Sequence, residues 1–462
     1  MSSKNGSSDS KDLKSILKEK IPIEDIRDSA SPKRIKSIDF VKGFAIVFII
    51  ICHTAASWFT DDWIYIYGLA FAWLDILGPS LFIFLSALSV IFSIRRKQGR
   101  LPDKVIRNRI FSRGISIILI GILFNFLGLS LVRKDIPFPL NLWGWNILVF
   151  LGFSQIFSYY ALKLKKIPRA VIGLFIIIIS PFFREFLYLG KDSNTILWIL
   201  HFIITSPAPQ LTLFPWLAIC FISTIFGEYL YEAMIIGTEE AYMSLFRLFL
   251  MWGIILVVIG VIIGWELQTT ETMNVDEYMH LELLGIMNQQ DYYKFPGMPG
   301  FLIRGTIGNM FYNLGAALLI IAISFYVIDI KKKDNNFLRI LIYYGKISLS
   351  LFLLHYIFIP LFVGQFSIIF FPFVCLAYVA FLGFFMYIWT EYGKGIGSPE
   401  WFMIQIGRIG QKTAKRVKKE FKKTEEIIVK GRKKVEEFVK KESEKIKETF
   451  KKKGKISNPS DD

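Results

Sequence analysis

Ionisable residues inside apolar runs are the part of this sequence that could do chemistry. His53 follows Lys42 by eleven residues in the run Ile38–Phe59, and imidazole has the near-neutral pKa that a general base needs. Asp75 lies near the start of the next run, where a carboxylate can hold an imidazole in one tautomer. Two structural roles compete with these: a histidine that hydrogen-bonds a neighbouring helix, and an aspartate that caps a helix with Pro79 in its first turn.

Two further histidines are candidates for binding an acceptor substrate. His355 ends the segment Gly345–His355, and His201 precedes a proline-containing segment. Two histidines and one aspartate at similar depth could in principle bind zinc. Because no pair of these residues has the i, i+4 spacing of a helical metal site, we expect no metal.

Three arginines precede or begin the third apolar run, and they are candidates for binding a phosphorylated cosubstrate. They are Arg107, Arg109 and Arg113, with Lys42 expected near the same plane. Guanidinium groups bind phosphate oxygens through paired hydrogen bonds. Taken singly, each arginine is also explained by the excess of positive charge on the cytosolic side of membrane proteins.

The composition decides which elements carry these residues. Of 462 residues, 53% are hydrophobic and 16% aromatic, and the mean hydropathy is +0.46. These values exclude a disordered protein and a secreted disulfide scaffold, and they do not fit a soluble chain. The three cysteines, Cys52, Cys220 and Cys375, lie in apolar runs, so we interpret them as packing residues. We expect an all-α polytopic membrane helix bundle.

Apolar runs close to the ~20 residues that span a bilayer as helix give about ten predicted membrane spans. They are Ile38–Phe59, Ala72–Ile94, Ile110–Val132, Ile147–Leu164, Ala170–Leu189, Leu211–Ala233, Leu245–Leu267, Thr306–Ile328, Leu338–Phe362 and Phe366–Trp389.

The charges of the connections predict the orientation of these spans. Lys and Arg concentrate in alternate connections, at 95–107, 163–169 and 331–333, whereas the long connection Leu267–Phe301 is acidic. Basic residues are retained on the cytosolic side. The connection 235–242, with two uncompensated glutamates, departs from this pattern. We expect a multi-pass protein of the cell membrane with both termini cytoplasmic.

Composition divides the chain into three segments. They are a polar N-terminal tail (1–36), a transmembrane domain (37–395) and a basic Lys/Glu-rich tail (396–462). From Met403 the last segment holds 20 Lys and Arg against 10 Asp and Glu, with helical periodicity. Such a helix can bind anionic lipid headgroups; the alternative is a solvated tail or a short coiled coil. We expect membrane lipids and not nucleic acid as partners, and the sequence is compatible with a homo-oligomer.

Five segments, in order, resemble the catalytic domain of the heparan-alpha-glucosaminide N-acetyltransferase family, within a transmembrane acyltransferase superfamily that includes the acyltransferase-type 3 proteins. The segments are Arg34–Ala45, Asp75–Ser86, Trp145–Gly152, Phe214–Trp216 with Gly227, and Gly345–His355, and the resemblance covers Arg34 to Trp389. In the type 3 relatives an Arg and a His eleven residues apart in the first helix are regarded as essential. Lys42 and His53 occupy those positions, and Lys42 keeps the charge but lacks the guanidinium fork.

This resemblance implies an integral-membrane acyltransferase. Acetyl-CoA or another acyl-CoA would be the cosubstrate, bound through its phosphates at the basic rim, and the acceptor would be an amine or hydroxyl of a glycan or glycolipid across the membrane. His53 would remove the acceptor proton or carry the acyl group itself, and Asp75 would orient its imidazole. The alternative is a transporter or flippase in which His53, Asp75 and His355 line a translocation path. A third hypothesis is a scaffold whose basic tail recruits a partner.

Overall fold

A computed structural model of the chain describes residues 35–60, 70–95, 98, 102–132, 136–205, 211–274, 277–278, 281, 284, 296–402, 405 and 437, with the backbone alone for 127–132. The chain divides into two compact units, Met1–Gly407 and Arg408–Asp462. The polar N-terminal tail and almost all of the basic C-terminal tail lie outside the described residues, so the expectations about them stay predictions.

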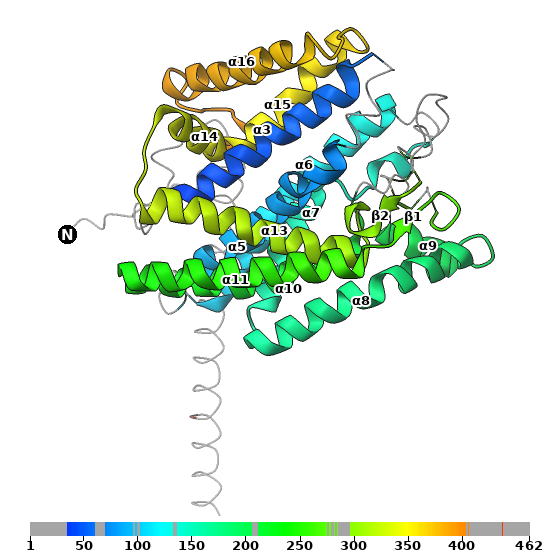
Figure 1. The fold of residues 1–462 in the computed structure, drawn as a ribbon, viewed down its shortest axis with the longest axis horizontal. Coiled ribbons are helices and arrows are strands. Elements are labelled where there is room, and N and C mark those ends of the chain that lie inside the picture. Colours follow the sequence, from blue (N-terminus) through cyan, green and yellow to red (C-terminus); the bar gives the residue numbers. More distant parts are fainter. Residues whose placement is uncertain are drawn as a thin grey trace, which may run out of the picture. The chain divides into compact units, whose positions relative to one another are not determined.

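The described part of the chain is almost entirely helical, which confirms the predicted fold class (Figure 1). In chain order the elements are α3 (Lys36–Trp58), η1 (Asp75–Leu77), α5 (Pro79–Arg95), α6 (Asp103–Val132), η2 (Leu140–Leu142), α7 (Ile147–Ala161), α8 (Lys166–Gly190), α9 (Thr195–Ile204), α10 (Leu213–Ile236), α11 (Glu239–Ile263), β1 (Leu267–Gln268), β2 (Met298–Pro299), η3 (Gly300–Leu302), α13 (Ile307–Phe325), η4 (Tyr326–Ile330), α14 (Asn336–Lys346), α15 (Ser348–Phe358), η5 (Ile359–Phe362) and α16 (Phe371–Glu391). The two short strands pair antiparallel.

Every predicted span coincides with a helix or a pair of helices. Within the described residues, 8 helices are long and apolar enough to cross a membrane, and the bent pair α14 and α15 makes up to 9. The remaining predicted span is α7, a shorter apolar helix of 15 residues, and its crossing of the membrane stays a prediction. Its side chains are mostly buried, so α7 is a core helix of the bundle.

Short polar side chains begin several of these helices by accepting a hydrogen bond from a backbone N–H of the first turn. These caps are Asn146 for α7, Asn194 for α9, Thr238 for α11, Thr306 for α13 and Asn335 for α14. The predicted spans begin within two residues of α7, α13 and α14, whereas α11 begins six residues before the predicted Leu245 and α9 is not among the predicted spans.

Gly43 and Gly345 let the backbones of α3 and α14 come into direct contact. A Cβ atom added at Gly43 would lie 1.8 Å from the carbonyl oxygen of Leu341, and one added at Gly345 would lie 1.7 Å from that of Asp39. No larger residue fits at either position without moving a helix. This contact fixes α3, the helix that carries His53, against the helix pair that carries His355.

The span predicted as one helix over Leu338–Phe362 is instead two helices that meet at an angle of 85°. Glu400 supplies the physical reason, because its carboxylate accepts hydrogen bonds from the backbone N–H of Ser350 at 2.8 Å and from the Ser350 hydroxyl. A carboxylate at these donors favours the start of a new helix. The apolar sequence alone conceals this break.

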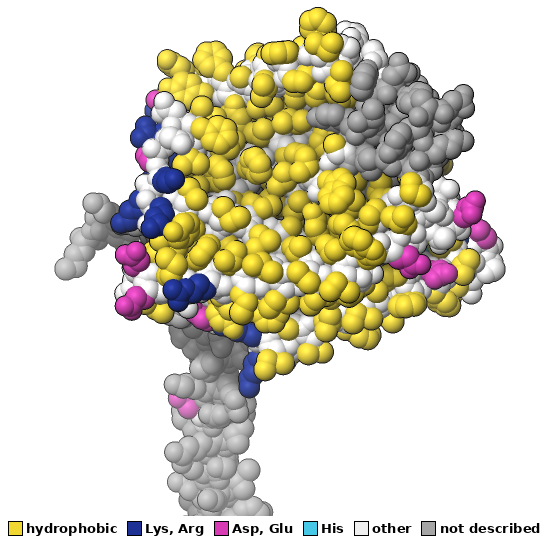
Figure 2. All heavy atoms as spheres, in the orientation of Figure 1, with side chains coloured by type: hydrophobic (Ala, Val, Ile, Leu, Met, Phe, Trp, Pro, Cys, Tyr) yellow, Lys and Arg dark blue, Asp and Glu magenta, His cyan; other side chains and the backbone are white. Residues whose placement is uncertain are grey.

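The molecular surface agrees with a multi-pass membrane protein. Figure 2 shows a face covered by hydrophobic side chains, with Lys and Arg gathered at its left edge. Large apolar side chains of α8, α11 and α16 are exposed, among them Phe175, Ile262 and Phe373. A continuous apolar surface of this kind needs lipid to cover it. Helices α11 and α13 lie side by side along this face (Figure 1).

Candidate active site

His53 of α3 and His355 of α15 form a hydrogen-bonded pair inside the bundle. Nδ1 of His53 lies 2.8 Å from Nε2 of His355, and the rings stack with centroids 5.1 Å apart. His355 is fully buried and His53 is half-buried. The sequence pointed to both residues but assigned them to different tasks, one as a base and the other in acceptor binding. The structure joins them in one unit.

The partners of these rings indicate which nitrogens carry protons. Nδ1 of His355 lies 3.2 Å from the carbonyl oxygen of Leu351, which can only accept a hydrogen bond. With its proton on Nδ1, neutral His355 presents Nε2 as an acceptor, so His53 donates from Nδ1. The basic nitrogen of the pair is therefore Nε2 of His53, and the hydroxyl of Tyr356 lies 3.4 Å from it.

Aromatic side chains enclose the histidine pair. The ring of Tyr356 lies 5.0 Å from that of His53, and the ring of Phe352 lies 5.5 Å from that of His355. The hydroxyl of Tyr378 donates to the backbone carbonyl of His355 at 2.5 Å and so ties α15 to α16. In such apolar surroundings a hydrogen bond is electrostatically stronger than in water. These contacts fix the orientation of both imidazoles.

Asp75 forms an ion pair with Arg304, a residue that sequence reasoning missed. Nε of Arg304 donates to one carboxylate oxygen at 3.1 Å, and a terminal nitrogen of Arg304 donates to the other. Nδ1 of His53 bonds to His355, and the predicted role of Asp75 in orienting the His53 imidazole stays a prediction. Arg304 lies in a short non-helical segment before α13, where no sequence pattern marks it.

Lys42 lies on the helix of His53 but far from its ring. Eleven residues at ~1.5 Å each separate the two by roughly 16 Å along α3. Nζ of Lys42 donates to the hydroxyl of Ser89 at 3.1 Å, which links α3 to α5. A direct part for Lys42 in proton transfer at His53 is incompatible with this separation.

The three arginines of the predicted basic rim lie on α6. At about 100° per residue, Arg109 and Arg113 share one face of the helix, while Arg107 points to another side. Arg107 and Arg113 are exposed and Arg109 is half-buried. The structure thus groups two of the three, and their role in binding phosphate stays a prediction.

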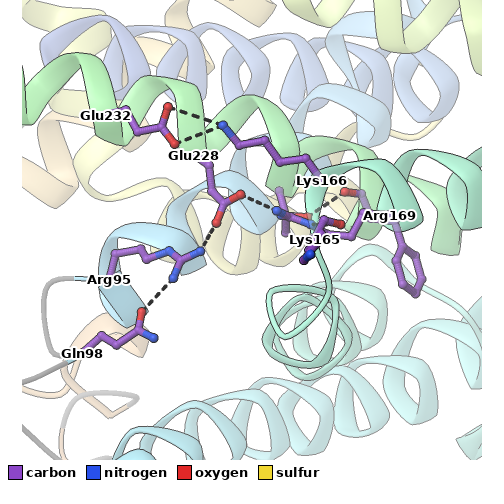
Figure 3. A network of polar contacts seen from close by, with 9 residues as sticks. Arg95, Gln98, Lys165, Lys166, Arg169, Glu228 and Glu232 are labelled. Carbon is purple, nitrogen blue, oxygen red and sulfur yellow. Dashed lines mark hydrogen bonds and ion pairs between the residues drawn. The ribbon is translucent and has the colours of Figure 1, made fainter.

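A second ion cluster, buried at Glu228 and Arg169 and open at its edge, joins α5, α8 and α10 (Figure 3). Glu228 accepts hydrogen bonds from Arg95 and from Arg169, and Lys166 pairs with Glu232 at 3.0 Å. In the sequence, these basic residues indicate only the orientation of the spans. The missed signal was an acidic residue inside an apolar span, which usually has a partner. We interpret this cluster as a structural link that holds α5, α8 and α10 together.

His201 contacts the loop that follows α11. Its Nε2 lies 2.9 Å from a carboxylate oxygen of Glu277. Arg184 of α8 donates to the Glu277 backbone carbonyl at 2.6 Å and to the other carboxylate oxygen at 3.2 Å. The guanidinium also lies 4.6 Å above the Tyr278 ring. His201 therefore anchors a loop in this structure, and its predicted contact with an acceptor stays untested.

We expect acid to weaken this anchor. Burial would raise the pKa of Glu277, but the hydrogen bond from His201 and the charge of Arg184 hold it below its ordinary value. A carboxyl whose pKa is lowered by folding stabilises the protein above its unfolded-state pKa, and this stabilisation is lost as the pH falls through the folded-state value. Hydrogen exchange of residues 264–274 should therefore quicken in acid. In Glu277→Gln, the amides of residues 264–274 should exchange fast already at neutral pH. Equal protection of these amides in the native chain and the variant would contradict this role of Glu277.

The comparison with known families identifies the domain that holds His53. Residues 34–254 match the family described as heparan-alpha-glucosaminide N-acetyltransferase, catalytic. This segment belongs to that family. The resemblance inferred from the sequence is thereby confirmed, and the heparan-alpha-glucosaminide N-acetyltransferase-type domain makes the protein an enzyme that transfers acyl groups. No curated protein and no solved structure matches the chain.

The N-acetyltransferase-type segment contains only part of the site. It begins just before α3 and ends within α11, so it includes His53 and Asp75. Their partners, His355 and Arg304, lie beyond its end. Within the described residues, no group of three or more His, Cys, Asp or Glu side chains is placed to hold a metal ion.

Proposed function

We propose that this N-acetyltransferase-type membrane protein moves an acetyl or other acyl group from acyl-CoA on the cytosolic side to an amine or hydroxyl of a glycan or glycolipid on the other side. The observation that carries the proposal is the hydrogen-bonded pair of His53 and His355, whose basic nitrogen is Nε2 of His53. The protein would lie in the cell membrane with both termini in the cytoplasm, as the charges of the connections predict.

The reaction follows from the position of that nitrogen. Nε2 of His53 takes the proton of the acceptor N–H or O–H while the acceptor atom attacks the thioester carbonyl carbon. The tetrahedral intermediate then expels the CoA thiolate, and the thiolate takes the proton back from His53. The products are the acylated acceptor and free CoA. A variant of this path has Nε2 attack the thioester first and carry the acyl group for one step.

His355 acts in this scheme as the partner of the base. When Nε2 of His53 gains a proton, the Nδ1–H that points at His355 becomes a stronger donor, and His355 shares the new positive charge. The hydrogen bond from His355 to the Leu351 carbonyl keeps the acceptor nitrogen turned toward His53. In many catalytic triads a carboxylate orients the histidine base, whereas here the neutral imidazole of His355 does so.

The donor would enter from the basic end of the bundle. Lys42, Arg109 and Arg113 would hold the CoA phosphates, since ammonium and guanidinium groups both bind phosphate oxygens. The long, thin pantetheine arm would then follow α3 from Lys42 toward His53, a path of roughly 16 Å along the helix axis.

The test uses the purified protein in lipid with radiolabelled acetyl-CoA. We expect free thiol to be released, and label to reach a glucosamine-terminated oligosaccharide but not its N-acetylated counterpart, which lacks the free amine. Transfer to the N-acetylated form as well would indicate a hydroxyl acceptor. Absence of thiol release with acetyl-, propionyl- and longer acyl-CoA would contradict acyl transfer and leave the transporter hypothesis, for which substrate flux is the measurement.

A further inference from the structure

We propose that Arg304 is a catalytic residue of the same centre, where its guanidinium stabilises the negative charge that forms on the thioester carbonyl oxygen. The inference rests on the proposed acyl transfer. It assigns a chemical role to an ion pair that the general-base scheme leaves unused. It also adds to the centre a residue that is far from α3 in the sequence.

The backbone around Arg304 is held firmly. The Asn309 side chain accepts from the N–H of Gly305 at 3.2 Å and donates to the carbonyl of Phe301 at 2.9 Å. The hydroxyl of Thr306 donates to the carbonyl of Gly300 at 2.6 Å. Gly305 has a φ of 90°, a conformation that favours glycine. Because these hydrogen bonds hold the backbone on both sides of Arg304, its side chain leaves the segment in a fixed direction.

Asp75 fixes the guanidinium itself. The two-point contact uses one nitrogen for each carboxylate oxygen, which sets the plane of the group. Burial alone would lower the pKa of Arg304, but the charge of Asp75 outweighs it, so the pKa stays above its ordinary value and the group stays cationic. Asp75 is accordingly a positioning residue for Arg304.

The ion pair adjoins the histidine site. The 3₁₀ turn that carries Asp75 packs against α3, the helix of His53. Helix α13, which begins three residues after Arg304, also packs against α3. The carboxylate of Asp75 is buried and the guanidinium of Arg304 is half-buried, and a pair of apolar residues would often serve stability as well. What distinguishes this ion pair from those at Glu228 and Glu277 is that the turn carrying Asp75 packs against the helix of His53.

The charge requirement of the reaction matches this cation. As the acceptor atom bonds to the carbonyl carbon, the π electrons of the C=O bond move onto oxygen, while the acceptor proton goes to Nε2 of His53. The oxygen carries a full negative charge until the C–S bond breaks and the thiolate leaves. A fixed cation in a low-dielectric site stabilises this oxyanion without having to reorganise.

The experiment removes the positive charge of Arg304 together with the negative charge of Asp75, so that no unpaired charge remains. We compare the native chain with the double variant Asp75→Asn/Arg304→Gln, and with Arg304→Lys, which keeps the charge. The double variant should lose about 10²- to 10³-fold in kcat, the usual effect of losing one oxyanion donor, with KM for both substrates almost unchanged. Arg304→Lys should lose less, and free guanidinium ion should partly rescue the double variant.

A matched control is the ion pair of Arg339 and Asp334, which is also two-point, at 2.9 and 3.0 Å, but exposed. Asp334→Asn/Arg339→Gln should leave kcat unchanged. Native kcat in the Arg304 double variant, a loss confined to KM, or an equal loss in Arg304→Lys would overturn the role of Arg304. These results would leave the proposed function intact as long as the native chain transfers acyl groups and His53→Ala does not. No transfer by the native chain would refute the proposed function itself.

Discussion

Replacement of His53 with alanine should lower the rate of acyl transfer by about 10²- to 10⁴-fold, the contribution that a positioned general base makes. Nε2 of His53 is the nitrogen that the hydrogen bonds of the pair leave basic, and alanine offers no substitute for it. Thiol release from acyl-CoA, measured with saturating acceptor in lipid, reports the loss directly. Membrane insertion should stay native, while thermal unfolding reports the cost of leaving Nε2 of the buried His355 without its donor.

The matched control for this variant is Phe44→Ala on the same helix, since Phe44 is an exposed apolar residue of α3. It should retain native turnover. If His53→Ala transferred acyl groups within threefold of the control, the base would lie elsewhere and the scheme would be wrong. A single turnover without acceptor separates the two paths: label retained on the native protein but not on His53→Ala would indicate an acyl-histidine intermediate.

The sequence predicts those parts of this molecule that depend on local patterns. Membrane spans follow from apolar runs near 20 residues, and His53 stands out because an ionisable group in such a run is costly. The starts of α7, α13 and α14 are similarly local, since the predicted spans begin within two residues of them. None of these features needs knowledge of which helices are neighbours.

The partners of the site residues depend on contacts that leave no local pattern. His53 and His355 are 302 positions apart, and Asp75 and Arg304 are 229 apart. Consecutive antiparallel helices made Asp75 the natural partner of His53 in the sequence, but α3 also contacts α13, α14, α15 and α16. Which of these supplies the partner is decided by tertiary packing.

Close helix contacts explain why the segment Gly345–His355 is informative, a reason that the sequence alone does not reveal. The segment Gly345–His355 contributed to the family resemblance, and its first glycine is the point where α14 meets α3. Its last residue is the partner of His53. Between them lies the break at Ile347, which the continuous apolar run conceals and which turns α15 so that His355 faces α3. The spacing of the segment thus reflects a bend that only the structure reveals.

Substitutions of His355 should separate its positioning role from a purely structural one. His355→Leu removes the acceptor for Nδ1 of His53, so kcat should fall by about 10²-fold or more, as it does when a triad loses the group that orients its imidazole. His355→Gln can still accept that hydrogen bond through its amide oxygen and should retain a substantial part of the rate. The pH profile of kcat/KM, measured for both variants, should shift in His355→Leu because the protonated base loses the partner that shares its charge.

A structural role for His355 would give a different pattern. Loss of packing alone would lower the unfolding temperature and the fraction of active enzyme, but the molecules that remain folded would keep the native pH profile. Equal losses in the leucine and glutamine variants, with an unshifted profile, would therefore contradict the pair. A shifted profile in the leucine variant and recovery in glutamine would show that the tautomer of His53 is held by a residue 302 positions away, since leucine is close to the ring in size but can accept no hydrogen bond.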